Sequence, residues 1–161
     1  MTASAAASIL EDLVETLEDG REGFKKAADK LEDDGHHELA EKMARYSDQR
    51  TRLANELRQI ALADGIEVEE KGTVAGALHR GWMAITDAVS GDDPHAVLAV
   101  AESGEDHAVA EFEKALRNDD LPASWRPVIT SQAEAVRSAH DEVRALRDQF
   151  QSDSGSWSNT G

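Results

Sequence analysis

The 161-residue sequence has no cysteine, which excludes disulfide scaffolds, cysteine-based zinc sites and thiol catalysis. No stretch approaches the ~20 apolar residues of a membrane-spanning helix. Basic residues are scarce, 17 against 33 acidic ones, and the formal net charge of -16 repels nucleic-acid phosphates and anionic membranes. We therefore expect a soluble, cytoplasmic protein that binds neither nucleic acid nor membrane.

Prolines number only three and aromatic residues make up 4%, whereas residues that favour helices are abundant. Apolar residues recur at alternating spacings of three and four, the period of an amphipathic helix, in four long segments. These segments cover about residues 8–32, 39–60, 94–117 and 127–150. A shorter segment with the same period covers about residues 73–90. The pattern predicts an all-α protein.

Start and stop signals agree with these segments. Ser8 and Glu11 have the spacing of a capping box, which predicts that the first helix begins there. Gly35 lies in a polar turn, and Gly65 after Asp64 suits the end of the second helix. Pro94 suits the first turn of the next long helix.

Two long helices precede and two follow an irregular connector of roughly 30 residues, which predicts a four-helix bundle with one long crossover. This connectivity is the ferritin-like one, with the short helix inside the crossover. We expect residues 8–150 to form one domain of this kind and residues 151–161 to form a disordered C-terminal tail.

The stretch AESGEDHAVAEFEKAL, residues 101–116, concentrates five carboxylates and a histidine. At ~100° per residue, Glu105 projects within ~20° of Phe112, in the middle of an apolar stripe. His107 projects to the opposite side, so we expect it to be solvated. Glu102 lies at the edge of the stripe, and we assign the charge of Asp106 to the surface.

The preceding long helix carries a similar anomaly of opposite sign, because Arg50 projects within ~20° of Leu57. Arg50 lies ~21 Å and Glu105 ~16 Å along helices expected to run parallel, one turn apart. The antiparallel last helix brings His140 to a similar height. One level of the bundle is therefore predicted to hold a polar layer of Arg50, Glu105 and His140. The first helix reaches this level with Asp19 and Glu22 toward its sides.

The sequence leaves two interpretations of this layer open. In the structural one, Glu105 pairs with Arg50 and the pair fixes helix register. In the other, Glu105 and His140 bind iron or manganese, with Asp19 or Glu22 as a further ligand. A dinuclear centre would need two Glu-x-x-His motifs, which the chain lacks, and Arg50 opposes cation binding. We favour the structural interpretation and expect no cofactor.

Catalytic arrangements are absent from the sequence pattern. The serines lack an inward-facing histidine–acid partner, and no glycine-rich loop could hold a phosphate, so we expect that the protein is not an enzyme. Trp125, between Pro122 and Pro127, is expected to anchor a loop.

Five stretches together resemble a known family. They are EDGREGFKKAAD, DQRTRLANEL, KGTVAGALHRGW, ESGEDHAVAEFEKAL and SAHDEVRAL. Over about residues 9–148 the chain is similar to an uncharacterised bacterial family of ferritin-like four-helix-bundle proteins, a domain of unknown function. The resemblance implies the ferritin-like fold in a bacterial cytoplasmic protein, and it implies no reaction. The matched residues of interest are Asp19, Arg50, His79, Arg80, Trp82, Glu105 and His140.

Three hypotheses for function follow. The first is a non-enzymatic bundle with a structural polar layer, stress-associated by analogy of fold, whose acidic surface maintains solubility or engages a basic protein partner. The second is a degenerate ferritin-like protein that binds iron or manganese. The third is a small-ligand binder, because small residues leave room in the core, namely Gly20, Gly23, Ala27 and Ala108. Such bundles also form homo-oligomers, which the sequence leaves open.

Overall fold

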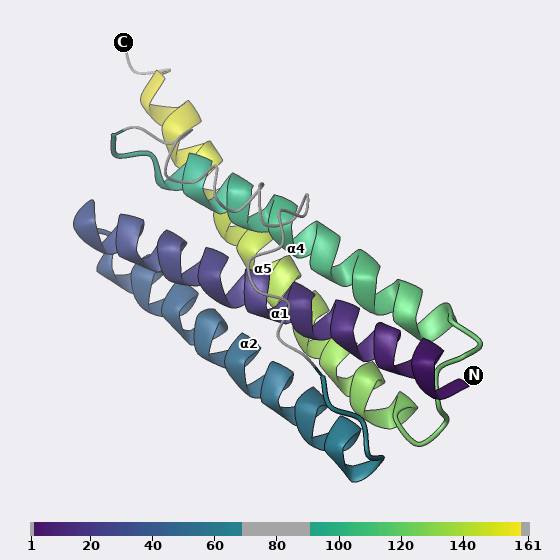
Figure 1. Ribbon diagram of the computed structural model, residues 1–161. Coiled ribbons are helices and arrows are strands. Elements are labelled where there is room, and N and C mark those ends of the chain that lie inside the picture. The colour runs from purple at the N-terminus through teal and green to yellow at the C-terminus, as the bar shows by residue number, and fades with distance from the viewer. Residues whose placement is uncertain (1, 69–90, 159–161) are drawn as a thin grey trace.

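The computed structural model describes residues 2–68 and 91–158, which form α-helices and no strand (Figure 1). The helices are α1 (Thr2–Asp33), α2 (His37–Ala63), α4 (Pro94–Arg117) and α5 (Arg126–Ser158). The prediction of an all-α protein with four long helices is confirmed for these residues. None of the helices in this part of the chain combines the length and the apolar character needed to cross a membrane.

The helices form two antiparallel hairpins (Figure 1). α1 and α2 form the first, α4 and α5 the second, and α1 packs against both α2 and α4. α2 and α4 run in the same direction, so α4 begins at the end of the bundle opposite to the one where α2 stops (Figure 1). Because α2 and α4 do not pack extensively against each other, a side chain that connects them must pass across the centre of the bundle.

Local residue chemistry accounts for most helix ends. Gly35 and Gly65 follow α1 and α2 with φ values of 86° and 75°, in the left-handed region that glycine adopts without strain. At the start of α4, the Asp93 side chain accepts a hydrogen bond from the Ala96 backbone N–H at 3.0 Å, and Pro94 occupies the first turn.

Two helix boundaries differ from those that the sequence suggests. α1 begins at Thr2, so Ser8 lies inside the helix and does not cap it. The alanines at positions 3 and 5–7 explain this, because alanine has the highest helix propensity. α5 continues to Ser158, so the tail expected over 151–161 lies partly in this helix and partly outside the described residues. The short helix expected over 73–90 also lies outside them.

The hydrophobic core consists of two clusters, one toward each end of the bundle. The first cluster includes Leu10, Leu13, Leu17, Leu57, Phe112, Trp125 and Ile129. The second cluster includes Phe24, Leu31, Met43, Leu98 and Val143. Each cluster contains residues of all four helices. Because the clusters lie toward opposite ends of the bundle, each helix needs an apolar face along most of its length.

Polar side chains connect α5 and the loop before it to α2. Trp125 is buried and donates its Nε1–H to Asp64 at 2.5 Å, so this tryptophan anchors the loop. Gln132 donates from Nε2 to the Leu53 carbonyl at 3.1 Å and to the Glu56 carboxylate at 2.8 Å. These bonds fix α5 beside α2 through directional contacts.

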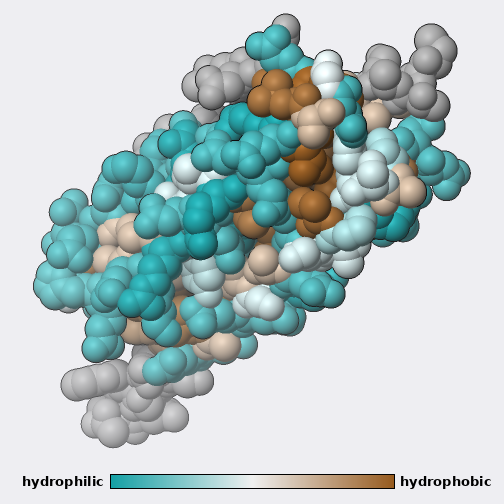
Figure 2. Space-filling model, turned by 90° about the horizontal axis from the view of Figure 1, so that it is seen from below, coloured by the Kyte–Doolittle hydropathy of each residue, from teal (hydrophilic) through white to brown (hydrophobic). Residues whose placement is uncertain are grey.

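The surface is mainly hydrophilic, with one apolar band on the face in Figure 2. Leu62, at 63% exposure, is the large apolar side chain that stands exposed among the described residues. In the interior of the same part of the chain, the buried charged side chains are Arg50, Glu102 and Glu105. Because charges are buried only when something compensates for their lost hydration, these three residues mark the candidate site.

Replacing Phe112 with alanine is expected to lower the free energy of unfolding by about 3–5 kcal/mol, because the fully buried ring would leave a cavity in the first core cluster. Leu62→Ala is the control, with an expected change within about 0.5 kcal/mol at this exposed position. Urea unfolding followed by circular dichroism measures both. Equal losses in the two variants would contradict the core position of Phe112.

Candidate functional site: a buried ion pair and a carboxylate–histidine group

Arg50 of α2 and Glu105 of α4 form an ion pair in the centre of the bundle. Nη1 of the arginine donates to Oε1 of the glutamate at 2.8 Å, and Nη2 donates to Oε2 at 2.6 Å. Both side chains are 0% exposed. One guanidinium therefore bonds both carboxylate oxygens, the geometry in which arginine binds a carboxylate most strongly.

α1 provides the space that Arg50 occupies. A Cβ atom built on Gly20 would lie 3.6 Å from Cγ and Nη1 of Arg50, so a side chain much larger than a methyl group would take the place of the arginine. One turn along α1, the Phe24 ring centroid lies 5.2 Å from the guanidinium carbon, within cation–π distance. Nε of Arg50 also donates to Gln49 at 3.3 Å. The positive charge of Arg50 is thus surrounded by hydrogen-bond acceptors and by an aromatic ring.

The ion pair separates the two core clusters. Along α4, Ala101 belongs to the second cluster and Ala108 to the first, and Glu105 lies between them. Along α1, Leu17 and Phe24 divide in the same way. The bundle therefore has an apolar region on either side of one charged level.

Burial changes the acid–base properties of groups at this level. Desolvation raises the pKa of the Glu105 carboxyl above its ordinary value, and the charge and hydrogen bonds of Arg50 oppose that rise. Burial also raises the pKa of the Tyr46 hydroxyl, as does the hydrogen bond that it donates to Glu142 at 2.5 Å. Burial thus disfavours the negatively charged form of both groups, and at Glu105 the neighbouring guanidinium opposes this effect.

His140 lies near this level and bonds to other partners. Its Nε2 is 2.5 Å from Oδ1 of Asp106, and its Nδ1 is 3.0 Å from Oδ1 of Asp141. The side chain is 12% exposed, at the seam between α4 and α5. His140 is close enough for its charge to lower the pKa of Glu105, but the structure gives the glutamate's hydrogen bonds to Arg50.

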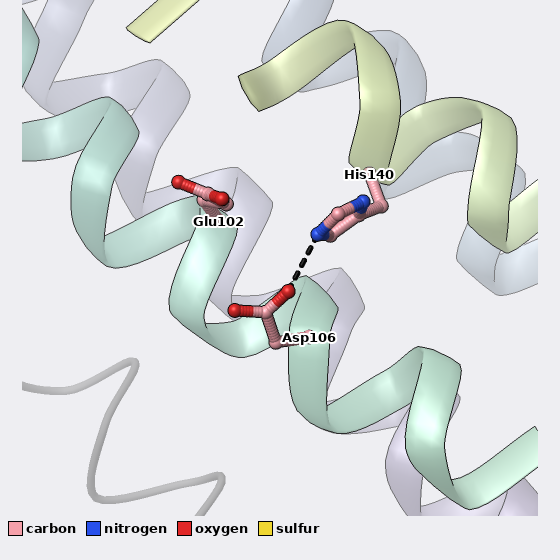
Figure 3. A group of neighbouring side chains, drawn as sticks. All are labelled: Glu102, Asp106 and His140. Atoms are coloured by element: carbon pink, nitrogen blue, oxygen red, sulfur yellow. Dashed lines mark hydrogen bonds and ion pairs between the residues drawn. The ribbon is translucent and has the colours of Figure 1, made fainter.

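Glu102 and Asp106 of α4 and His140 of α5 form a group of potential metal ligands (Figure 3). One ligand atom from each lies within 4.8 Å of the other two. Glu102 is buried and pairs with Arg147, while Nε of Arg144 lies 3.8 Å from its Oε1. This is a carboxylate–imidazole combination suited to transition metals.

Asp19 and Glu22 are the further residues that the sequence places at this level of the bundle. Asp19 and Glu22 are partly buried on α1, and Oε1 of Glu22 is 3.8 Å from Nη2 of Arg21. Among the described residues, the group of potential ligands includes neither of them, nor Glu105. The remaining matched residues, His79, Arg80 and Trp82, lie outside the described residues.

The sequence pattern does not by itself identify Glu102 and Asp106 as partners of His140. The available signal was their spacing, because residues four apart share a helix face. An antiparallel helix that carries a histidine at the same height completes the group. Asp106 was instead assigned to the surface, and its side chain is indeed 64% exposed.

The space next to Gly20, predicted as room for a small ligand, is filled by Arg50. Ala27 and Ala108 are packed in the core clusters. The glycine in α1 therefore makes room for a side chain of the protein itself.

A comparison with protein families places residues 5–118 in one family, described as "Domain of unknown function (DUF2383)". The match covers α1 from residue 5 onward together with α2 and α4, and so includes both members of the buried ion pair. No curated protein matches the chain.

Glu105→Ala is expected to lower the free energy of unfolding by about 3–5 kcal/mol, because it leaves the Arg50 charge buried without its partner. The double variant Arg50→Met with Glu105→Leu is expected to recover much of that loss. Glu41→Ala is the control, because it removes the exposed Arg45–Glu41 pair, worth at most about 1 kcal/mol. Urea unfolding measures all three, and a double variant no more stable than Glu105→Ala would contradict direct pairing.

Tyr46 is the one tyrosine of the chain, so the tyrosinate absorption band follows its ionisation directly. We expect this ionisation to occur at higher pH in the folded protein than in denaturant, where the pKa is about 10. Because the folded pKa is the higher one, the stability due to neutral Tyr46 is complete below about pH 10 and is lost as pH rises toward the folded pKa.

Glu142→Gln should bring the folded value of Tyr46 closer to that of the unfolded chain, because the variant removes the neighbouring negative charge. Identical titration curves for the folded and denatured wild-type protein would refute the hydrogen bond from Tyr46 to Glu142.

Proposed function

We propose that this chain, which belongs to the family described as "Domain of unknown function (DUF2383)", is a non-enzymatic helical-bundle protein whose buried polar layer is structural. The observation that carries the proposal is the ion pair itself. Both oxygens of the Glu105 carboxylate are bonded by Arg50, so the inward-facing carboxylate is already occupied by a cation of the protein.

The permanent charge of Arg50 also argues against an inner metal centre formed by Glu105 and His140. A guanidinium remains protonated at any physiological pH, and it would repel an incoming cation in a medium of low dielectric constant. Exchanging the arginine for a metal would strand a buried positive charge, at a cost of several kcal/mol. Binding of iron or manganese at the inner level is therefore the less favoured alternative.

The structural role of the layer is to fix the register of α2 against α4. A leucine pair can slide along an apolar groove at small cost, whereas a two-point ion pair has one geometry that satisfies both charges. The parallel course of α2 and α4 supports a ferritin-like bundle with a long crossover (Figure 1). A bacterial cytoplasmic, stress-associated role follows from resemblance and analogy of fold alone.

A net charge of -16 supports a basic protein partner for the acidic surface. Opposite charge accelerates encounter and discriminates among partners, and it weakens with added salt. The same charge opposes self-association at low salt, so a homo-oligomer would need an interface that avoids the acidic side chains.

The test of the structural interpretation is iron chemistry. Purified protein that receives iron(II) under anaerobic conditions and then oxygen should show no iron oxidation that depends on Glu105, because the inner carboxylate is held by Arg50. The Glu105→Gln variant should behave like the wild type. Protein-dependent oxidation that disappears in Glu105→Gln would overturn the proposal and make the inner level a reactive metal centre.

A further inference from the structure

We propose that Glu102 and Asp106 of α4 and His140 of α5 bind one divalent transition-metal ion at the seam between the two helices. A ligand atom of each residue already lies within 4.8 Å of the others, a distance that small rotations of the side chains would close around an ion. This site is separate from the Arg50–Glu105 pair, whose carboxylate points into the core, and it extends beyond the function proposed above.

The positions of the three residues follow from helix geometry. Glu102 and Asp106 are four residues apart, one turn along the same face of α4. The His140 ring reaches toward this face from α5 (Figure 3). Glu102 is buried, His140 is largely buried and Asp106 is exposed, so the site is closed toward the core and open toward solvent on one side. An ion could enter past Asp106.

The hydrogen bonds of His140 provide an independent reason for a cation at this place. A neutral imidazole has one N–H, and here a carboxylate faces each ring nitrogen. When Nδ1–H donates to Asp141, the lone pair of Nε2 faces the Asp106 carboxylate at 2.5 Å. Two acceptors at that distance repel each other unless a cation lies between them. A second proton would serve at this distance, and a metal ion would serve once the two side chains rotate apart to about 3 Å, since an ion bonds each ligand at about 2 Å.

Asp141 has the position of a supporting residue for such a metal. Histidine ligands in metal sites usually donate their second N–H to a carboxylate, which fixes the tautomer and the orientation of the ring. In the tautomer that carries its proton on Nδ1, His140 donates to Asp141 at 3.0 Å in this way and leaves Nε2 for the ion. The histidine is thus already oriented for metal binding.

Arg147 competes with the ion for Glu102. Its Nη1 bonds the Glu102 carboxylate, and its Nη2 donates to Asp148 at 2.8 Å. A metal that takes Glu102 must displace Arg147, which keeps Asp148 as a partner. The arginine therefore lowers the affinity of the site without blocking it, and its removal should strengthen metal binding.

The ligand set determines the class of ion. One imidazole nitrogen with two carboxylates suits Zn²⁺, Co²⁺, Fe²⁺ or Mn²⁺, whereas Mg²⁺ and Ca²⁺ prefer oxygen ligands alone. Three protein ligands leave at least one coordination position for water. Zn²⁺ and Co²⁺ are the appropriate probes, because Zn²⁺ binds well to such ligands and Co²⁺ reports its coordination by visible absorption.

Isothermal titration of Zn²⁺ and Co²⁺ into metal-free, full-length protein tests the site, with Mg²⁺ as the control for diffuse attraction to the acidic surface. We expect one Zn²⁺ or Co²⁺ per chain with a visible Co²⁺ spectrum. His140→Gln and Asp106→Asn should each weaken binding at least tenfold. His107→Gln is the matched control, since His107 lies on α4 with Glu111 at 3.8 Å and belongs to no three-residue group of ligands among the described residues.

Two further variants separate a built site from surface attraction. Asp141→Asn should weaken binding about 10–100-fold, the usual effect of losing a residue that orients a histidine ligand. Arg147→Gln should tighten binding, because it frees Glu102. Circular dichroism verifies that each variant is folded, and the exposed Asp106 can be changed without disturbing the core.

The alternative outcomes are distinct. Absence of Zn²⁺ and Co²⁺ binding would overturn the proposal, as would affinity that His140→Gln and Asp106→Asn leave unchanged. In a further outcome, His140→Gln and His107→Gln change the metal affinity equally while Arg147→Gln raises it. That outcome would assign the binding to surface carboxylates, and it too would overturn the proposal. Since none of these variants alters Arg50 or Glu105, failure here would leave the structural interpretation of the ion pair intact.

Discussion

The pairing of Arg50 with Glu105 is the constraint on which the rest of the bundle depends. The two helices that carry these residues lie on opposite sides of α1, so only a long side chain can connect them across the centre (Figure 1). Gly20 leaves the room for that side chain, and Phe24 covers its charge. Once both charges are buried, neither can be removed alone without leaving the other desolvated and unpaired. Apolar packing can then proceed separately on either side of this level, which is why the core divides into two clusters.

One helix presents carboxylates to two different environments within five residues. Glu105 projects into the core and meets a fixed organic cation, whereas Glu102 and Asp106 project toward α5 and meet a histidine and an arginine. The difference arises from rotation about the α4 axis, since Glu102 and Asp106 are ~40° apart and Glu105 is ~60° from Glu102. A buried carboxylate with a permanent partner serves stability and register. A carboxylate beside a titratable or displaceable partner can exchange that partner for a ligand.

Much of this architecture could be predicted from periodicity, because burial on one face imposes the spacing of apolar residues. The same count placed Arg50 and Glu105 on inward faces at similar heights, where the structure joins them. Periodicity could not assign the partner of His140. This residue lies at the edge of the apolar face of its helix, where a small rotation of the helix decides which neighbouring helix the side chain faces. The start of α1 was misjudged for a related reason: the capping-box spacing at Ser8 is a local signal, and the alanines before it favour continued helix. The partner that a side chain contacts on another helix depends on how the two helices pack, which the sequence of either helix alone does not determine.

The distribution of arginines explains how a chain with twice as many acidic as basic residues remains compact. Arg50, Arg147 and Arg58 each bond a carboxylate that is at least partly buried, where an unpaired negative charge would be most costly. Carboxylates at the surface are hydrated and need no such partner. The net negative charge is therefore borne mainly by the exterior, and it attracts cations of every kind. Selective binding of one kind of cation therefore requires a site where ligands with a fixed orientation accompany the negative charge. Among the described residues, the group at the α4–α5 seam combines two carboxylates with an oriented imidazole, so its selectivity would derive from the coordination preferences of the ion as well as from charge.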